Sequence, residues 1–448
     1  MKKVKRRSLS LLILVLVMGL GLGIYIVSLA VNGGRWASFA AGRYQYAGGG
    51  SASGSITDRN GVMLTTVSNG KRIFSDDEAL RKSTLHTVGD SAGNIGTGAM
   101  RQFASDLTGY DFINGVYSLS GGGENVELSI DAELNKTAYK ALNGRKGAVL
   151  VMNYETGEIL CMVSSPTFDP ANPPEVEEGD PAYEGVYINR ALSSAYTPGS
   201  VFKLVTAAAV IEKLPDVFER VFECSGGVNI GGETVTCMKK HGTLTFEDAL
   251  AVSCNTVFAE LSLELGADTL ERYASNYGLL ERNTVSGIKT AKGLFEKAPD
   301  GSAGLAWSGI GQYDDLVCPV SMLRFVSAVA NNGNAPEMTL LKKNSLLGLR
   351  RAKTSRVLKK DTSEELRAMM NYNVYYNYGE ENFPGLKLYA KSGTAEVGGG
   401  KQPHSWFTGF IKNEGHPLAF VVVIENGGLG SDAAAKAANT VLQAAVSR

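Results

Sequence analysis

The sequence is poor in the residues that build metal and disulfide sites. Its 448 residues include only five cysteines and four histidines, and the histidines lie far apart along the chain. An odd, scattered set of cysteines is not the framework of a disulfide-rich protein, and no Cys-x-x-Cys pair of the zinc-binding kind occurs. The sequence therefore predicts neither a metal site nor a cofactor.

Net charge is also nearly absent. The chain has 44 Lys and Arg residues against 45 Asp and Glu, for a formal charge of −1. Without a strong positive field, nothing indicates a nucleic-acid partner. Apolar residues make up 44% and charged residues 20%, an ordinary globular composition. The length predicts about two to four domains.

Charge is missing altogether from one long segment, residues 9–31, which follows a basic stretch at residues 1–8. As a helix this segment would be about 35 Å long, enough to cross a hydrocarbon core of roughly 30 Å. We predict a transmembrane anchor with residues 1–8 in the cytoplasm and the rest of the chain outside. A cleaved signal peptide would have a shorter apolar region, and a buried soluble helix would not be apolar on every face.

The rest of the chain divides into three parts. Residues 32–55 are rich in Gly and Ser and are predicted to be a flexible stalk. Residues 56–125 contain short mixed segments and a hairpin signal at Asn60-Gly61, and we interpret them as a small accessory domain with little core of its own. Residues 126–448 are predicted to form one larger domain.

The larger domain alternates strand-like and helical segments. Its predicted strands are residues 147–153, 158–164, 386–390, 405–411 and 418–425. Its predicted helices include residues 131–142, 200–214, 245–265 with a break near Ser253, and 431–446. Five strands interrupted by a large helical insert predict an α/β fold with an antiparallel sheet.

The first of three short motifs is Ser200-Val-Phe-Lys203. Pro198-Gly199 precedes it, which places Ser200 at the start of a helix, and the i,i+3 spacing puts Lys203 on the same face. A serine hydroxyl becomes a good nucleophile when a neighbouring base takes its proton. A lysine whose pKa is lowered by burial can be that base, and the helix start offers N–H groups to an oxyanion.

The second motif is Ser253-Cys254-Asn255, at the predicted break between two helical pieces. There Ser253 could relay a proton and Asn255 could hold a substrate amide. We interpret Cys254 as a small buried residue that points away from the substrate.

The third motif is Lys391-Ser392-Gly393-Thr394, on a strand-like segment. Lys391 offers positive charge and the two hydroxyls offer donors to a carboxylate, while Gly393 allows close approach of a substrate backbone. Each motif alone could be an ordinary helix, a surface break or a lysine-tipped strand. The three in this order are the motif set of penicillin-binding proteins and class A β-lactamases.

With these motifs, the chain resembles the class B penicillin-binding proteins, the monofunctional D,D-transpeptidases of peptidoglycan synthesis. The similarity extends from about residue 54 to the end, and its flanking segments are Gly54–Gly61, Asn189–Ala191, Tyr196–Lys203, Gly309–Gln312, Pro319, Ala330–Gly333 and His404–Phe410. The accessory domain is short for the family, and Tyr196-Thr197 stands where Tyr-Pro is commoner. The resemblance implies a penicillin-binding, serine β-lactamase-like transpeptidase domain with a five-stranded antiparallel sheet.

The resemblance also implies a mechanism. Ser200 would attack the D-Ala-D-Ala carbonyl of a stem peptide, with Lys203 as the base and Ser253 as the proton shuttle to the leaving amine. An amine of a neighbouring strand would then take the acyl group. The backbone N–H groups of Ser200 and Thr394 would form the oxyanion hole.

Substrate binding follows from the same resemblance. Asn255 would hold the donor peptide, and Lys391, Ser392 and Thr394 would bind the carboxylate, which β-lactams mimic. A SEDS-type glycosyltransferase in the membrane would be the partner, contacted through the anchor and the accessory domain. A β-lactamase or D,D-carboxypeptidase of the same fold, a catalytically silent scaffold of a wall-synthesis complex and a β-lactam-sensing receptor are the alternatives.

A further prediction concerns Cys224 and Cys237, which flank a short predicted hairpin just before His241-Gly242. The hairpin could bring the two sulfurs together in a compartment where disulfides persist. Either a disulfide or two free thiols fits this pattern.

Overall fold

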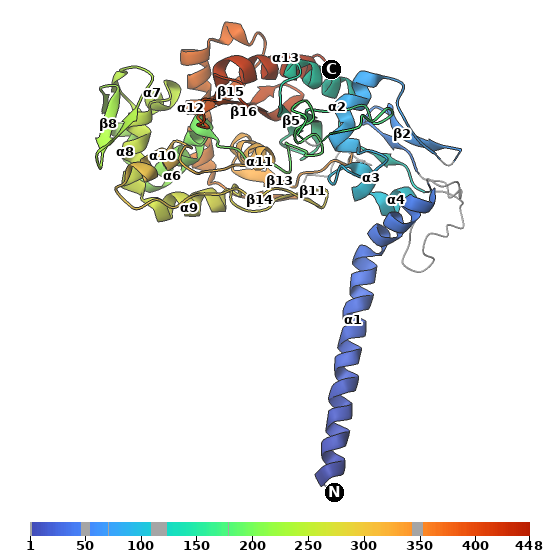
Figure 1. Ribbon diagram of the computed structural model, residues 1–448. Coiled ribbons are helices and arrows are strands. Elements are labelled where there is room, and N and C mark those ends of the chain that lie inside the picture. Colours follow the sequence, from blue (N-terminus) through green and yellow to red (C-terminus); the bar gives the residue numbers. More distant parts are fainter. Residues whose placement is uncertain (1, 46–53, 70, 109–122, 178, 343–352) are drawn as a thin grey trace.

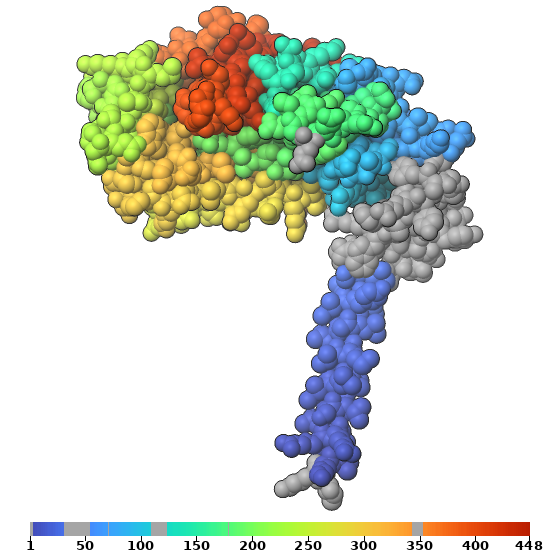
Figure 2. Space-filling view, viewed as in Figure 1, coloured from blue at the N-terminus to red at the C-terminus, as the bar shows by residue number. Residues whose placement is uncertain are grey.

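The computed structural model describes residues 2–45, 54–69, 71–108, 123–177, 179–342 and 353–448. A single long helix, α1 (Lys2–Gln45), projects from a globular body in Figures 1 and 2. Its segment Lys3–Ala30 is long and apolar enough to span a membrane, and none of its most apolar 18-residue window is buried. This agrees with the predicted anchor at residues 9–31.

The helix continues past the predicted end of the anchor. Residues 32–45 are helical, so the prediction of a flexible stalk over 32–55 needs correction there, while residues 46–53 lie outside the described residues. The sequence offers a reason, because Ala37, Ala40 and Ala41 favour helix and no proline interrupts the segment.

The accessory region contains a small sheet with the strand order β3-β2-β1-β4. Its strands are β1 (Ile56–Thr57), β2 (Met63–Ser68), β3 (Lys71–Phe74) and β4 (Val126–Glu127), and its helices are α2 (Glu78–Val88), α3 (Ala99–Gln102) and α4 (Ala104–Thr108). The hairpin predicted at Asn60-Gly61 is confirmed, because β1 and β2 pair antiparallel across it.

The boundary predicted between residues 125 and 126 does not separate two bodies. Strand β4 pairs in parallel with β1, so the first residues assigned to the larger domain belong to the accessory sheet. Ile56 and Leu64 also share one apolar cluster with Leu150 of the central sheet. The accessory region therefore packs against the larger domain and shares its core, as its weak hydrophobic pattern predicts.

The central sheet is five-stranded and antiparallel throughout, with the order β15-β16-β17-β5-β6. Its strands are β5 (Gly147–Asn153), β6 (Ile159–Ser165), β15 (Leu388–Ala395), β16 (His404–Asn413) and β17 (His416–Ile424). Side chains alternate between the two faces. Val149 and Val422 face helices α5 (Ala132–Leu142) and α13 (Ala435–Val446), whereas Leu150 faces the helical insert. The predicted α/β architecture is confirmed.

The helical insert lies between β6 and β15 in sequence and covers one face of the sheet (Figure 1). Its helices are α6 (Lys203–Lys213), α7 (Phe246–Ala251), α8 (Asn255–Leu265), α9 (Ala267–Asn276), α10 (Ala303–Gly309), α11 (Pro319–Ala330) and α12 (Lys360–Asn373). Short strand pairs lie among them: β7 (Phe222–Cys224) with β10 (Gly242–Leu244), β8 (Gly227–Ile230) with β9 (Glu233–Thr236), β11 (Thr284–Val285) with β12 (Ile288–Lys289), and β13 (Asn334–Pro336) with β14 (Thr354–Arg356). The pairs β7–β10 and β8–β9 form the end of the body away from α1 in Figure 2.

Candidate active site

The turn that carries Ser200 is held tightly against the central sheet. Residues Gly199–Val201 form one 3-10 turn that leads into α6. Gly199 has φ +57°, and a Cβ there would lie 2.6 Å from the carbonyl oxygen of Thr394. The indole Nε1 of Trp406 donates to the carbonyl of Thr197 at 3.0 Å. Ser200 is therefore presented beside strand β15, at the start of a helix as predicted.

Lys203 lies one helical turn further on and is fully buried. Its Nζ donates to the carbonyl oxygen of Ser253 at 2.7 Å, to Ser253 Oγ at 3.1 Å and to Asn255 Oδ1 at 2.7 Å. The first two motifs, 50 residues apart in the chain, thus meet through one amine.

Ser253 occupies the break between α7 and α8 that the sequence predicts. Its φ is +56°, a left-handed conformation that non-glycine residues seldom adopt and that concentrates at functional sites. Its hydroxyl also accepts a hydrogen bond from Lys391 Nζ at 3.0 Å. Ser253 Oγ therefore lies between two lysine amines.

The environment of both amines favours their neutral forms. Burial lowers the pKa of Lys203 to about 8, against a smaller opposing effect of Cys254 and Cys237. Burial, and then the charge of Lys203, lowers the pKa of Lys391 well below its usual value. A lysine with a pKa near neutrality can accept a proton from a neighbouring hydroxyl at physiological pH.

The third motif lies on β15, and its polar groups form hydrogen bonds with Gly430 and with Tyr378. Gly430 N donates to Thr394 Oγ1 at 3.2 Å. The backbone N–H of Ser392 donates to Tyr378 Oη at 2.6 Å, and Tyr378 Oη donates to Ser392 Oγ at 2.8 Å. Tyr378 belongs to no motif, and nothing in the sequence separates it from its tyrosine neighbours.

Gly393 is required by the protein's own packing. A Cβ at Gly393 would lie 2.8 Å from the carbonyl of Pro198, in the turn that carries Ser200. The sequence suggested that this glycine admits a substrate backbone. In the structure, the segment that approaches it closely is the nucleophile turn.

A second cluster of side chains lies directly behind the second motif. The sulfurs of Cys224 and Cys237 are 3.7 Å apart, so the predicted hairpin does bring them together, with both cysteines as free thiols. His241 and Cys254 complete a group whose ligand atoms lie within 4.8 Å of one another. No metal-binding signal is visible here in the sequence, because the four residues are separated by 12, 3 and 12 others and contain no close cysteine pair.

Comparison with known proteins gives a consistent result. The family model described as the penicillin-binding protein transpeptidase domain matches residues 147–445, more than half of the chain. The chain belongs to the class B penicillin-binding proteins. A peptidoglycan D,D-transpeptidase PbpA from Mycobacterium tuberculosis is 29% identical over 72% of this chain and 73% of its own length. The stage V sporulation protein D of Bacillus subtilis is 29% identical over 69% of this chain and 51% of its own length.

Solved structures agree with this assignment. The penicillin G acyl-enzyme complex of the M. tuberculosis penicillin-binding protein A superposes with a TM-score of 0.75 at 25% identity, covering 89% of this chain and 100% of that one. A D,D-transpeptidase domain from Eggerthella lenta gives a TM-score of 0.74 at 27% identity, covering 89% and 99%. This penicillin-binding protein is therefore a serine D,D-transpeptidase, and its long apolar N-terminal helix marks it as membrane-anchored.

Proposed function

We propose that this penicillin-binding protein cross-links peptidoglycan stem peptides through an acyl-enzyme on Ser200. The observation that carries the proposal is the position of Ser253 Oγ, 3.1 Å from Lys203 Nζ and 3.0 Å from Lys391 Nζ. A serine nucleophile needs a base to take its proton, and a leaving amine needs an acid to supply one. This chain of groups, which begins at Lys203 one helical turn after Ser200, offers both.

In acylation, Ser200 Oγ forms a bond to the carbonyl carbon of the penultimate D-Ala while its proton passes to the neutral Lys203 amine. As the C–N bond to the terminal D-Ala breaks, Ser253 Oγ gives its proton to the leaving nitrogen and regains one from Lys203. The backbone N–H groups of Ser200 and Thr394 stabilise the oxyanion that forms in between. An amine of a second stem peptide then attacks the ester and releases Ser200.

Substrate binding uses both sides of the cleft. Lys391, Ser392 and Thr394 receive the substrate carboxylate, with Gly393 between them. A bound carboxylate supplies the negative charge that buried Lys391 lacks, so binding raises the pKa of that amine and favours its charged form. Asn255 Nδ2, which donates to the carbonyl of Thr236 at 2.7 Å, transfers its hydrogen bond to the donor peptide.

The anchor places this chemistry at a membrane surface. The basic stretch at residues 1–8 keeps the N-terminus in the cytoplasm and the catalytic domain, residues 126–448, outside. A SEDS-type glycosyltransferase, bound through α1 and the accessory region at residues 56–125, supplies the glycan strands. Co-purification of such a polytopic enzyme with the full chain, lost when α1 is replaced by an unrelated membrane helix, would support this part.

The test of the central claim uses the detergent-solubilised full chain and a fluorescent penicillin. The wild type should form a long-lived covalent adduct, and mass spectrometry of its peptides should place the adduct on Ser200. Ser200→Ala should form none. Ser193→Ala, which changes an exposed serine a few residues upstream, is the matched control and should label normally.

Two outcomes would contradict the proposal. An adduct that persists in Ser200→Ala would place the nucleophile elsewhere. Rapid release of the hydrolysed drug by the wild type would make the enzyme a β-lactamase, because water rather than an amine would then attack the acyl-enzyme.

A further inference from the structure

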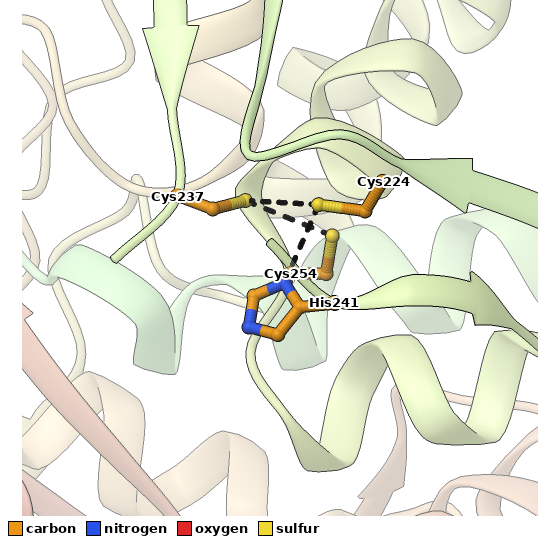
Figure 3. Close-up of side chains that lie close together, drawn as sticks. All are labelled: Cys224, Cys237, His241 and Cys254. Carbon is orange, nitrogen blue, oxygen red and sulfur yellow. Dashed lines mark hydrogen bonds between the residues drawn. The ribbon is translucent and has the colours of Figure 1, made fainter. Parts of the chain in front are cut away.

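Four potential metal ligands from separate segments converge behind the second motif. Figure 3 shows the side chains of Cys224, Cys237, His241 and Cys254 pointing toward one another. All of their ligand atoms lie within 4.8 Å of each other, and Cys224 and Cys254 are buried. None of the four belongs to the proposed proton relay.

Three of the six distances between ligand atoms match those of a tetrahedron around one ion. Zinc binds sulfur at about 2.3 Å and histidine nitrogen at about 2.0–2.1 Å, so two ligands of one tetrahedral ion lie about 3.8 Å apart for S···S and about 3.5 Å for S···N. The Cys224–Cys237 and Cys237–Cys254 sulfurs are both 3.7 Å apart. Cys224 Sγ is 3.4 Å from His241 Nδ1.

The local fold builds this arrangement from short elements. Pairing of β7 with β10 sets Cys224 opposite Gly242 and so brings His241 beside it. The hairpin of β8 and β9 returns the chain so that Cys237 follows β9. Cys254 is the N-cap residue of α8. Three turns of the chain thus aim their ligands at one point.

The backbone around Cys237 also suits a negatively charged sulfur. The N–H groups of Asn255 and Thr256, the first two residues of α8, donate to Cys237 Sγ at 3.2 and 3.4 Å. The amino end of a helix carries partial positive charge, and N–H donors of this kind orient and stabilise metal-bound thiolates.

We propose that Cys224, Cys237, His241 and Cys254 bind one zinc ion. Three thiolates and one imidazole in a tetrahedron are a ligand set that selects zinc. A disulfide between Cys224 and Cys237 needs sulfurs about 2.05 Å apart. It would also leave Cys254 and His241 beside the pair with no ion to bind. Because the protein supplies all four ligands, the site is structural and leaves no open position for a reactant.

The proposed ion fixes the second motif. Cys254 lies between Ser253 and Asn255, so a bond from its sulfur to zinc holds the left-handed turn at Ser253 in place. Asn255 is linked to the same cluster through its backbone N–H, which donates to Cys237 Sγ. Zinc would act as a positioning element that holds Ser253 Oγ against both lysine amines.

The first test is metal content. The full chain, purified without chelator, should contain close to one zinc per chain, and Cys224→Ser, Cys237→Ser and His241→Ala should each lose it. Cys161→Ala, which alters a buried cysteine of β6 outside the cluster, should keep its zinc. A wild type that holds no zinc after incubation with Zn²⁺ would overturn the proposal.

The second test stays informative if the variants fail to fold. Co²⁺ exchanged into the wild type should give the absorption of a tetrahedral ion with thiolate charge-transfer bands. Absence of these bands, or a thiol count showing an oxidised Cys224–Cys237 pair in the native protein, would overturn the site.

The third test addresses the positioning role. A zinc chelator should slow acylation by penicillin roughly 10–100-fold, and added Zn²⁺ should restore the rate. Zinc that is bound but whose removal leaves the acylation rate unchanged would overturn the positioning role. A wild type that binds zinc but never forms the Ser200 adduct would instead contradict the proposed function.

Discussion

The two sides of the catalytic cleft are built in different ways. The side with Ser200 and the third motif rests on the five-stranded sheet, where the nucleophile turn packs so closely on β15 that Gly199 and Gly393 have no room for a Cβ. The side with Ser253 and Asn255 rests on short strand pairs of three or four residues and on a helix break. Close packing fixes the position of the side with Ser200, whereas the side with Ser253 depends on the Cys/His cluster for its position.

The largest expected effect comes from the amine that joins the two sides. Lys203→Met keeps most of the side-chain volume but removes the base, so the rate of acylation should fall by roughly 10²–10⁴-fold. Stopped-flow measurement with a chromogenic β-lactam checks this, and Lys213→Met, at the exposed end of α6, is the control. Normal acylation by folded Lys203→Met would show that another group takes the Ser200 proton.

The close packing of the sheet side is tested by a pair of glycine variants. Gly199→Ala combines a left-handed φ with a contact of 2.6 Å to the Thr394 carbonyl, while Gly301→Ala has φ +76° and open space around its Cβ. Backbone strain alone costs about 1–3 kcal/mol. Gly301→Ala should therefore lose only that stability and acylate normally.

Gly199→Ala should lose more stability in denaturant unfolding and acylate on the order of 100-fold more slowly, because a shift of about 1 Å in a nucleophile is that costly. Equal rates for the two variants would mean that the turn can move, and the contrast between the two sides would fail.

The side of the cleft that carries Ser253 and Asn255 is tested by hydrogen exchange. On removal of zinc, the amides of Asn255 and Thr256 should exchange about 10–100-fold faster, because their acceptor, Cys237 Sγ, is no longer fixed. Amides of β16 in the central sheet should be unaffected. A uniform increase over both regions would show that zinc supports the whole fold and not one side of the cleft.

The same contrast explains what the sequence could predict. Strands of the central sheet, the Ser253 break and the three motifs all leave local signals, namely hydrophobic runs, turn residues and fixed spacings. The meeting of Cys254 with Cys224 and His241 leaves none, because it depends on how short strand pairs return the chain. Tyr378 was missed for the same reason, since its contacts to Ser392 come from the packing of the helical turn Val374–Tyr378, which follows α12, against β15. The helix through residues 32–45 was missed because its glycines resemble a linker.

The smallest effect expected is the pH dependence of the acylation rate, which reports on the Lys203 amine that joins the two sides of the cleft. Lys203 is a base only when neutral, and its pKa is lowered to about 8, so the acylation rate should rise with pH through this value. Between pH 7 and pH 9 the neutral fraction increases about tenfold. The titratable groups around the amine are Lys391 from β15, whose own pKa the charge of Lys203 lowers, and Cys254 and Cys237, which favour the charged form of Lys203.

Carboxylate binding needs charged Lys391, so drug affinity should weaken as pH rises while the acylation rate constant increases. Single-turnover kinetics at several drug concentrations separates the two. A flat rate constant from pH 6 to pH 9 would mean that Lys203 does not carry the proton.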